Sequence, residues 1–216
     1  MSQVDFKIIL LGSQGVGKTS IFMRYVYSHF ATCPYKTVST LGAVFGSKHV
    51  TAANNKVFSI GIWDTAGSER YYSMTKLYYR NARAAVVCYD PFCTDSWERV
   101  VFWVTELRAQ EEDCKVYICQ TKRDIVECEA IKPAVDIHDA QDYTDSIGGK
   151  FFNVSSKTGQ NIEELFQQIV SDLSSDPKCM SQLRTERDRL QQEATLVGLR
   201  DKISSRGDRF KMACRC

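Results

Sequence analysis

The sequence lacks the features that mark secreted, membrane-spanning and zinc-binding proteins. It has no CxxC pair with zinc-ligand spacing, no apolar run near the roughly 20 residues that span a bilayer, and no apolar secretory segment near its start. Ser2 follows Met1, where N-myristoylation would require glycine. We therefore expect a reducing, cytoplasmic environment, in which most of the nine cysteines are free and buried.

An excess of charge of one sign is also missing. The formal net charge of +2 over 216 residues is too small to indicate a nucleic-acid ligand. Residues 174–216 hold ten Lys or Arg against six Asp or Glu, so the positive excess lies in this C-terminal segment. The segment is charged and weakly periodic, and we expect it to be flexible and partly helical after one domain over residues 1–173.

Short apolar runs alternate with amphipathic stretches along most of the chain. Apolar strands separated by helices are typical of a parallel sheet covered on both faces, so the sequence predicts an α/β fold. Because ligands bind such sheets at the carboxyl ends of the strands, we expect functional residues directly after the apolar runs. The predicted strands are 6–11, 57–63, 84–89, 116–120 and 151–154, and the predicted helices are 20–27, 97–109, 139–147 and 161–173.

A glycine-rich segment follows the first apolar run. Residues 12–19, Gly-Ser-Gln-Gly-Val-Gly-Lys-Thr, satisfy the phosphate-binding pattern GxxxxGK[ST], and their place between a strand and a helix argues against a merely structural turn. Such a loop points backbone N–H groups at phosphate oxygens, Lys18 reaches the β- and γ-phosphates, and the Thr19 hydroxyl binds Mg²⁺. The expected phosphate-binding residues are Gly12, Gly15, Val16, Gly17, Lys18, Thr19 and Ser20.

A second motif lies at the end of the run over 57–63. Asp64 suits the shell of a Mg²⁺ ion, and Gly67 allows a backbone N–H to approach the γ-phosphate. Residues 63–69, Trp-Asp-Thr-Ala-Gly-Ser-Glu, resemble the WDTAGQE motif of Ras-like small GTPases, with Ser68 in place of glutamine. The resemblance implies the small-G-protein fold of P-loop NTPases, a six-stranded, mostly parallel sheet with helices on both faces, and GTP hydrolysis with Mg²⁺.

Two further segments indicate guanine as the base. Thr121-Lys122-Arg123-Asp124 resembles the NKxD motif, in which the aspartate accepts from guanine N1–H and N2–H₂ and the lysine stem covers the base plane. Residues 155–157, Ser155-Ser156-Lys157, resemble the SAK loop, whose backbone N–H contacts guanine O6. A P-loop kinase or an ATPase has no need of this pair of motifs.

Within the small GTPases, the chain resembles the Rab family over about residues 5–173. Residues 40–45, Thr-Leu-Gly-Ala-Val-Phe, match the Rab pattern TIGxxF, which implies that Thr40 closes over the γ-phosphate and completes the Mg²⁺ shell. Phe30 lies where the family covers the base with an aromatic ring. Because the interval from Phe30 to Thr40 is longer than usual, Thr37 and Ser39 are alternative candidates for the role of Thr40. The variations are most similar to the Rab-twenty-four-like branch, which is linked to autophagy and late membrane traffic.

The Rab resemblance also implies partners. Phe45, Trp63 and Tyr78 would form the aromatic triad that effectors contact, although a core role for Trp63 alone is an equal alternative. Cys214 and Cys216 resemble the CxC end at which two geranylgeranyl groups attach, and two lipid chains hold a membrane stably where one does not. The expected partners are guanine nucleotide, endomembranes on their cytoplasmic face, effectors, an exchange factor, Rab escort protein and GDP-dissociation inhibitor.

Three departures from the family pattern affect the expected chemistry. Ser68 is too short to orient the attacking water as glutamine does, and Gln14 stands where the family has a small residue near the γ-phosphate, so we expect weak hydrolysis. A rival hypothesis is that Gln14 itself orients the water. Thr121 replaces an asparagine that ties its loop to the phosphate-binding loop, which predicts faster nucleotide exchange.

The sequence thus predicts a slow Rab-like GTPase that switches between GTP and GDP forms in vesicle trafficking. Two alternatives remain at this point, a GTP-loaded scaffold with negligible turnover and a Ras-like regulator without membrane attachment. The expected catalytic residues are Lys18, Thr40, Gly67, Ser68 and Gln14, the metal ligands are Thr19, Thr40 and Asp64, and the remaining nucleotide contacts are Phe30, Gly67, Thr121, Lys122, Asp124, Ser155, Ser156 and Lys157.

Overall fold

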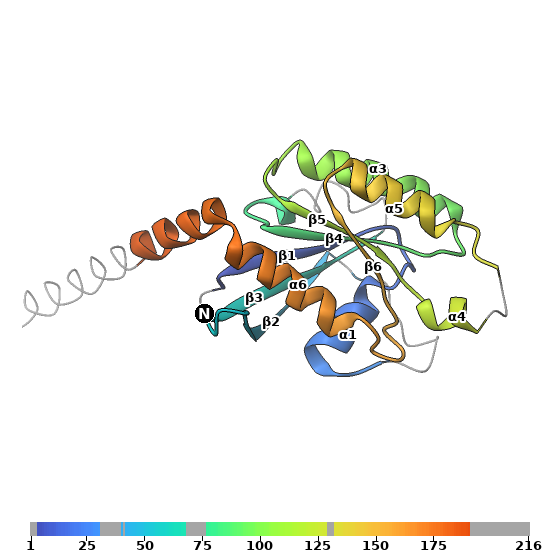
Figure 1. Cartoon of the computed structure of the whole chain (residues 1–216), viewed down its shortest axis with the longest axis horizontal. Helices are drawn as coiled ribbons and strands as arrows, with labels where there is room; N and C mark the ends of the chain where they lie inside the picture. The colour runs from blue at the N-terminus through green and yellow to red at the C-terminus, as the bar shows by residue number, and fades with distance from the viewer. Residues whose placement is uncertain (1–3, 31–39, 41, 68–76, 129–131, 191–216) are drawn as a thin grey trace, which may run out of the picture. The chain divides into compact units, whose positions relative to one another are not determined.

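The structure is a computed structural model that describes residues 4–30, 40, 42–67, 77–128 and 132–190 (Figure 1). It divides into two compact units, residues 1–173 and residues 174–216. In the second unit, residues 177–190 are helical. Within the described residues, no helix combines the length and the apolar character needed to cross a bilayer.

The first unit is built on one six-stranded sheet in the order β2-β3-β1-β4-β5-β6. Only the pairing of β2 with β3 is antiparallel, and the other neighbours pair in parallel. This confirms the predicted six-stranded, mostly parallel α/β fold. The strands are β1 (Phe6–Leu11), β2 (Ala43–Thr51), β3 (Val57–Thr65), β4 (Ala84–Tyr89), β5 (Lys115–Gln120) and β6 (Lys150–Asn153).

Helices cover both faces of the sheet, with α1 and α6 on one face and α3 and α5 on the other (Figure 1). On the first face, the rings of Tyr25 in α1 and Phe166 in α6 stack with their centroids 3.8 Å apart. On the second, Trp103 of α3 packs into a cluster with the buried side chains of β1, β4 and β5. The helices are α1 (Lys18–Tyr27), α3 (Thr94–Arg108), α4 (Arg123–Glu127), α5 (Ile137–Ser146) and α6 (Ile162–Ser175).

The central strands are buried on both faces, which explains their continuous apolar sequence. All six residues of β4 are buried, and five of the six in β1 are buried. The six cysteines in the described part of the chain are free, and four of them are buried: Cys88, Cys114, Cys119 and Cys179. Such cysteines act as small apolar side chains in the interior.

Candidate functional site

The motif segments expected from the sequence meet at one edge of the sheet. The strand order places β3 on one side of β1 and β4 on the other, and connections leave β1 in both directions from this point. In open α/β sheets, ligands bind outside the carboxyl ends of the strands at such a position. The phosphate-binding loop (residues 12–19) follows β1, and the segments containing Gly67, Thr121 and Ser155 follow β3, β5 and β6.

Glycines permit the course of the phosphate-binding loop. Gly12 has φ +133°, and a Cβ atom there would lie 2.2 Å from the carbonyl oxygen of Cys88 in β4. Gly17, with φ +103°, is the N-cap residue directly before α1. A larger residue at position 12 would therefore separate the loop from the sheet, whereas glycine lets the loop turn tightly into the N-terminus of α1.

The Lys18 side chain lies inside the phosphate-binding loop and bonds to its backbone. Its Nζ donates to the carbonyl oxygens of Gly12 at 2.7 Å and Ser13 at 2.8 Å, and the side chain is almost completely buried. Burial lowers the pKa of the Lys18 ammonium, while the nearby Cys88 and Asp64 act in the opposite direction. The loop thus holds a cation beside a helix N-terminus, which favours an anionic ligand such as a phosphate chain.

Three oxygen-bearing side chains meet next to Lys18. The Thr19 hydroxyl donates to Oδ2 of Asp64 at 2.7 Å, the Thr40 hydroxyl lies 3.1 Å from that of Thr19, and it donates to the same carboxylate oxygen at 3.4 Å. Asp64 is fully buried, and its Oδ1 has no hydrogen-bond partner among the described protein atoms. Burial raises the pKa of Asp64, and the bonds from Thr19, the charge of Lys18 and the bond from Thr40 oppose the rise.

This set of oxygens fits Mg²⁺. The ion takes hard oxygen ligands and commonly binds through one or two protein groups together with phosphates and water. A buried carboxylate oxygen without a hydrogen-bond partner among the described protein atoms is available as a ligand for the ion or as a hydrogen-bond acceptor for its bound water. No cluster of three or more His, Cys, Asp or Glu that could hold a metal occurs in the described residues.

Gly67 approaches the phosphate-binding loop closely from the end of β3. A Cβ atom at Gly67 would lie 2.5 Å from Nζ of Lys18 and 2.6 Å from the backbone nitrogen of Gln14. Only glycine therefore fits between these groups without moving the loop. Gln14 itself is exposed at the tip of the loop.

A cavity of about 270 Å³ adjoins the loop, of a size that suits a purine base. Asp124 of α4 lines this cavity, and its Oδ1 accepts from the Ser155 hydroxyl at 2.7 Å, while its Oδ2 lies 3.8 Å from Nζ of Lys157. Ser155 thereby fixes the orientation of the Asp124 carboxylate. The cavity is lined by Gly15, Gly17, Ser20, Phe30, Thr121, Lys122, Asp124, Ile125, Ser156 and Lys157, of which only Ile125 was absent from the predicted contacts.

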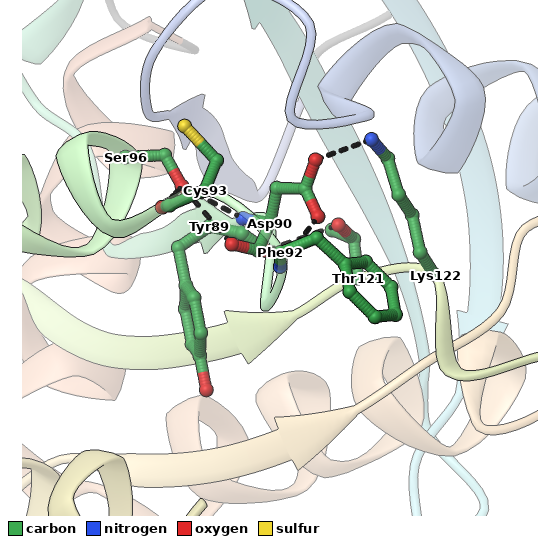
Figure 2. Close-up of polar contacts among 7 residues, drawn as sticks. All are labelled: Tyr89, Asp90, Phe92, Cys93, Ser96, Thr121 and Lys122. Atoms are coloured by element: carbon green, nitrogen blue, oxygen red, sulfur yellow. Dashed lines mark hydrogen bonds and ion pairs between the residues drawn. The ribbon is translucent and has the colours of Figure 1, made fainter. Parts of the chain in front are cut away.

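The Thr121–Lys122 segment is attached to the end of β4 (Figure 2). The Thr121 hydroxyl donates to the Tyr89 carbonyl at 3.0 Å, and the Lys122 ammonium forms an ion pair with Oδ2 of Asp90. The other oxygen of Asp90 accepts from the backbone N–H of Phe92 at 3.1 Å. Sequence reasoning did not single out Asp90, because its partner is 32 residues away and no motif joins the two.

The proposed effector residues lie on β2, β3 and the helical turn that includes Tyr78. Phe45 and Trp63 are register partners on β2 and β3, and their rings pack with centroids 4.7 Å apart. Phe45 is 49% exposed, while Trp63 and Tyr78 are partly buried. Trp63 also packs against the apolar cluster beneath α3 and carries the Lys7 ammonium 4.9 Å above its ring, so it combines a core contact with a surface position.

Several expected residues lie outside the described part of the chain. They are Thr37, Ser39, Ser68, Cys214 and Cys216. The expectations attached to these residues concern the switch threonine, the water-orienting position and the lipid anchor, and they stay predictions.

The fold is that of P-loop nucleotide-binding proteins, and the segments expected to bind phosphate, Mg²⁺ and the base lie at one edge of the sheet. The chain belongs to the Ras family, whose profile matches residues 7–175, and within it to the Rab-type small GTPases. Members of this family are GTPases that bind GTP or GDP with Mg²⁺, and Rab-type members act in vesicle trafficking.

Three Rab proteins show the extent of the similarity. Ras-related protein Rab-24 of Dictyostelium discoideum is 41% identical over 171 residues, which cover 79% of this chain and 82% of the relative. Ras-related protein Rab-5A of the same organism is 40% identical over 80% of this chain and 83% of its own length. Ras-related protein Rab-31 of Rattus norvegicus is 39% identical over 76% and 81%.

Proposed function

We propose that this protein is a guanine-nucleotide switch of vesicle trafficking that binds Mg²⁺ and hydrolyses GTP slowly. One observation carries the proposal: the structure brings the Thr19, Thr40 and Asp64 oxygens together within hydrogen-bond distance beside the Lys18 loop. These side chains come from α1, from the segment before β2 and from β3, and their meeting joins the metal corner to the phosphate loop. Mg²⁺, when bound, neutralises charge on the phosphates and helps to polarise the bond that breaks.

Each part of the chain then has a defined task. The phosphate loop and Lys18 bind the phosphate chain, Thr19, Thr40 and Asp64 hold Mg²⁺, and the Gly67 N–H faces the γ-phosphate. Asp124, fixed by Ser155, accepts hydrogen bonds from the guanine N1–H and N2–H₂, which adenine does not offer. Phe30, Lys122, Ser156 and Lys157 enclose the base.

The proposal includes a slow rate of GTP hydrolysis. Phosphoryl transfer depends on positioning and electrostatic stabilisation, and a serine at position 68 cannot place the attacking water as a glutamine does. The Thr121 hydroxyl is engaged by Tyr89, which supports the expectation of faster exchange because this hydroxyl makes no tie to the phosphate loop. With GTP in excess over GDP in the cytosol, slow hydrolysis and fast exchange together favour the GTP-bound form.

Residues 1–173 form the GTPase domain in this proposal, and residues 174–216 form the hypervariable segment that carries the lipid anchor. Geranylgeranylation at Cys214 and Cys216 would place the protein on the cytoplasmic face of endomembranes. Rab escort protein and GDP-dissociation inhibitor would carry the lipid-modified protein. Effectors would bind through Phe45, Trp63 and Tyr78. A role in autophagy or late membrane traffic is proposed from the similarity to the Rab-24 branch.

The experiment that tests the function is to measure the nucleotide content of the purified protein and follow it at physiological temperature with Mg²⁺. We expect stoichiometric guanine nucleotide and conversion of GTP to GDP over hours. A preparation without guanine nucleotide, and with no affinity for added GDP, would contradict the proposal. GTP that persists unchanged would favour the second candidate function, a scaffold that recruits partners without turnover, which the residues at positions 14 and 68 support.

A further inference from the structure

Arg24 lies in the last turn of α1 and is not among the residues that line the base pocket. Its guanidinium donates through Nε to the carbonyl oxygen of Ser156 and through Nη2 to that of Lys157, both at 2.6 Å. These are charge-assisted bonds to two successive carbonyls in the loop after β6, and the partners are 132 and 133 residues away along the chain. The side chain therefore joins α1 to the loop expected to contact guanine O6.

Fixing these carbonyls also fixes N–H groups. In a planar trans peptide the C=O and the next residue's N–H point in opposite directions, so turning the Ser156 carbonyl toward Arg24 directs the Lys157 N–H away from it. The Ser155 carbonyl is likewise engaged, by the Gly159 N–H at 2.8 Å, which directs the Ser156 N–H. Both residues line the pocket, and neither N–H donates to a protein acceptor among the described residues.

The same guanidinium also lies near an aromatic ring that lines the pocket. Its Cζ lies 5.9 Å from the centroid of the Phe30 ring, within the range of a cation–π interaction, and Phe30 lines the pocket. A flat guanidinium can present two N–H groups to neighbouring carbonyls while one face meets an aromatic ring, and an ammonium cannot do all of this at once. Arg24 thus contacts both the loop after β6 and the Phe30 ring.

Resting on the proposed function, we propose that Arg24 is a positioning residue that sets the recognition of the guanine 6-oxo group without touching the nucleotide. Recognition of the purine then divides between two parts of the site. Asp124, held by Ser155, accepts from the N1–H and the 2-amino group, while the Lys157 N–H, oriented by Arg24, donates to O6 together with the Ser156 N–H of the same loop. Loss of Arg24 weakens the second part and leaves the first.

The test compares the release of three fluorescent ribose-labelled nucleotides from the full-length protein. GDP has every group, inosine diphosphate lacks the 2-amino group that Asp124 binds, and 6-thioguanosine diphosphate replaces O6 by sulfur, a weaker acceptor. We expect Arg24→Gln to release GDP about tenfold faster, the effect of losing charge-assisted bonds. We also expect the ratio of release rates for the thio analogue and GDP to fall toward unity, while the ratio for inosine diphosphate and GDP stays unchanged.

Two variants complete the design. Arg24→Lys keeps the charge beside Phe30 but cannot serve both carbonyls, so the thio ratio should fall there too, in a protein that retains the cation. Arg108→Gln is the matched control, because Arg108 also donates to two carbonyls, those of Glu112 at 3.3 Å and Ile147 at 3.2 Å, outside the pocket. This control should leave all three release rates unchanged.

The outcomes separate this inference from the function on which it rests. If the parent protein retains GDP and the Arg24 variants speed the release of all three nucleotides by the same factor, Arg24 is only structural and the inference is wrong. Unchanged GDP release in both Arg24 variants would also overturn it. If the parent protein itself shows no affinity for GDP, the proposed function fails, and the recognition of O6 fails with it.

Discussion

A single residue, Thr121, attaches the base-binding loop to strand β4. Its backbone N–H and its hydroxyl both donate to the Tyr89 carbonyl, each at 3.0 Å, so the residue is bound twice to β4. Its Cβ lies only 3.7 Å from where a Cβ of Gly17 would be, so the side chain is close to the phosphate loop but its hydrogen bond points elsewhere. The phosphate loop and the base-binding loop are therefore in contact at Thr121, but the Thr121 hydroxyl forms no hydrogen bond between them.

Restoring an asparagine at this position should slow nucleotide release. An amide has a second polar atom that can reach the phosphate loop, and one added hydrogen bond is worth about 1 kcal/mol, or about fivefold in rate. We expect Thr121→Asn to release labelled GDP about fivefold more slowly than the parent protein, as measured by fluorescence after adding excess GDP. Thr121→Ser, which keeps the bond to Tyr89, is the control and should resemble the parent. Equal or faster release from the asparagine variant would contradict the explanation.

Gln14 permits a second prediction at the same scale. A Cβ atom at Gly67 would lie 2.6 Å from the backbone nitrogen of Gln14, so this exposed residue lies near the position expected for the γ-phosphate. We expect Gln14→Gly to hydrolyse GTP several-fold faster in a single-turnover assay, because a small residue leaves room for the water and for an activating arginine. Slower hydrolysis would instead support the rival role of Gln14 in orienting the water. Labelled GDP release from the same variant checks that binding is intact.

The residues that could be found from the sequence are those that belong to contiguous motifs. Lys18, Thr19, Asp64 and Asp124 each lie in a short pattern whose chemistry requires that residue type at that spacing. Arg24 could not be found in this way, since its role depends on two carbonyls more than a hundred residues away. Asp90 likewise acquires its partner Lys122 only when β4 and β5 pair side by side.

At the scale of elements, the missed ones are those with weak internal patterns. Strand β2 is an edge strand with an irregular burial pattern, and it contains Gly46, Ser47 and Lys48, which seldom indicate a strand. Helix α4 has five residues, none of them buried. Predicted elements with strong apolar character agree with the structure to within three residues at each end, because burial on the central sheet determines both their sequence and their bounds.

Helix α6 is held to the sheet by a polar group as well as by its apolar face. Asp172 accepts from the Tyr117 hydroxyl of β5 and the Lys150 ammonium of β6, each at 2.8 Å. Burial would raise the pKa of Asp172, but the bonds from Lys150, Tyr117 and Gln168 outweigh it and leave the pKa below its usual value. The carboxylate therefore binds its proton less readily in the folded than in the unfolded protein.

A pH dependence follows from this depressed pKa. A group whose folded pKa lies below its unfolded value stabilises the fold above the unfolded pKa, near 4, and that contribution disappears as pH falls through the folded pKa. We expect Asp172→Asn to lower the free energy of unfolding by about 1 kcal/mol at neutral pH and by less in acid. Urea unfolding of the GDP-saturated protein at several pH values measures this. Asp145→Asn, at an exposed position of α5, is the control and should have little effect.

At the scale of the whole molecule, the two compact units have separate proposed tasks, nucleotide binding in residues 1–173 and membrane attachment through the end of residues 174–216. Replacing both Cys214 and Cys216 by serine would remove both of the proposed lipid attachment points. We expect this double variant to move from membranes to the cytosolic fraction of cells while releasing labelled GDP at the parent rate. Single replacements should have an intermediate effect, since one lipid chain gives only reversible binding. An unchanged cellular distribution of the double variant would favour a regulator without membrane attachment.

The site draws on segments from Gly12 to Lys157, which span most of the first unit. A ligand that contacts all of them favours the folded chain by mass action, because it binds the assembled segments and not the unfolded ones. Because Thr121 is expected to cause rapid nucleotide release, this protein would spend more time without a bound nucleotide and therefore without that stabilisation. Nucleotide supply would then govern how long each molecule survives proteolysis as well as which partners it meets, so the cellular abundance of this protein should follow the concentration of guanine nucleotides.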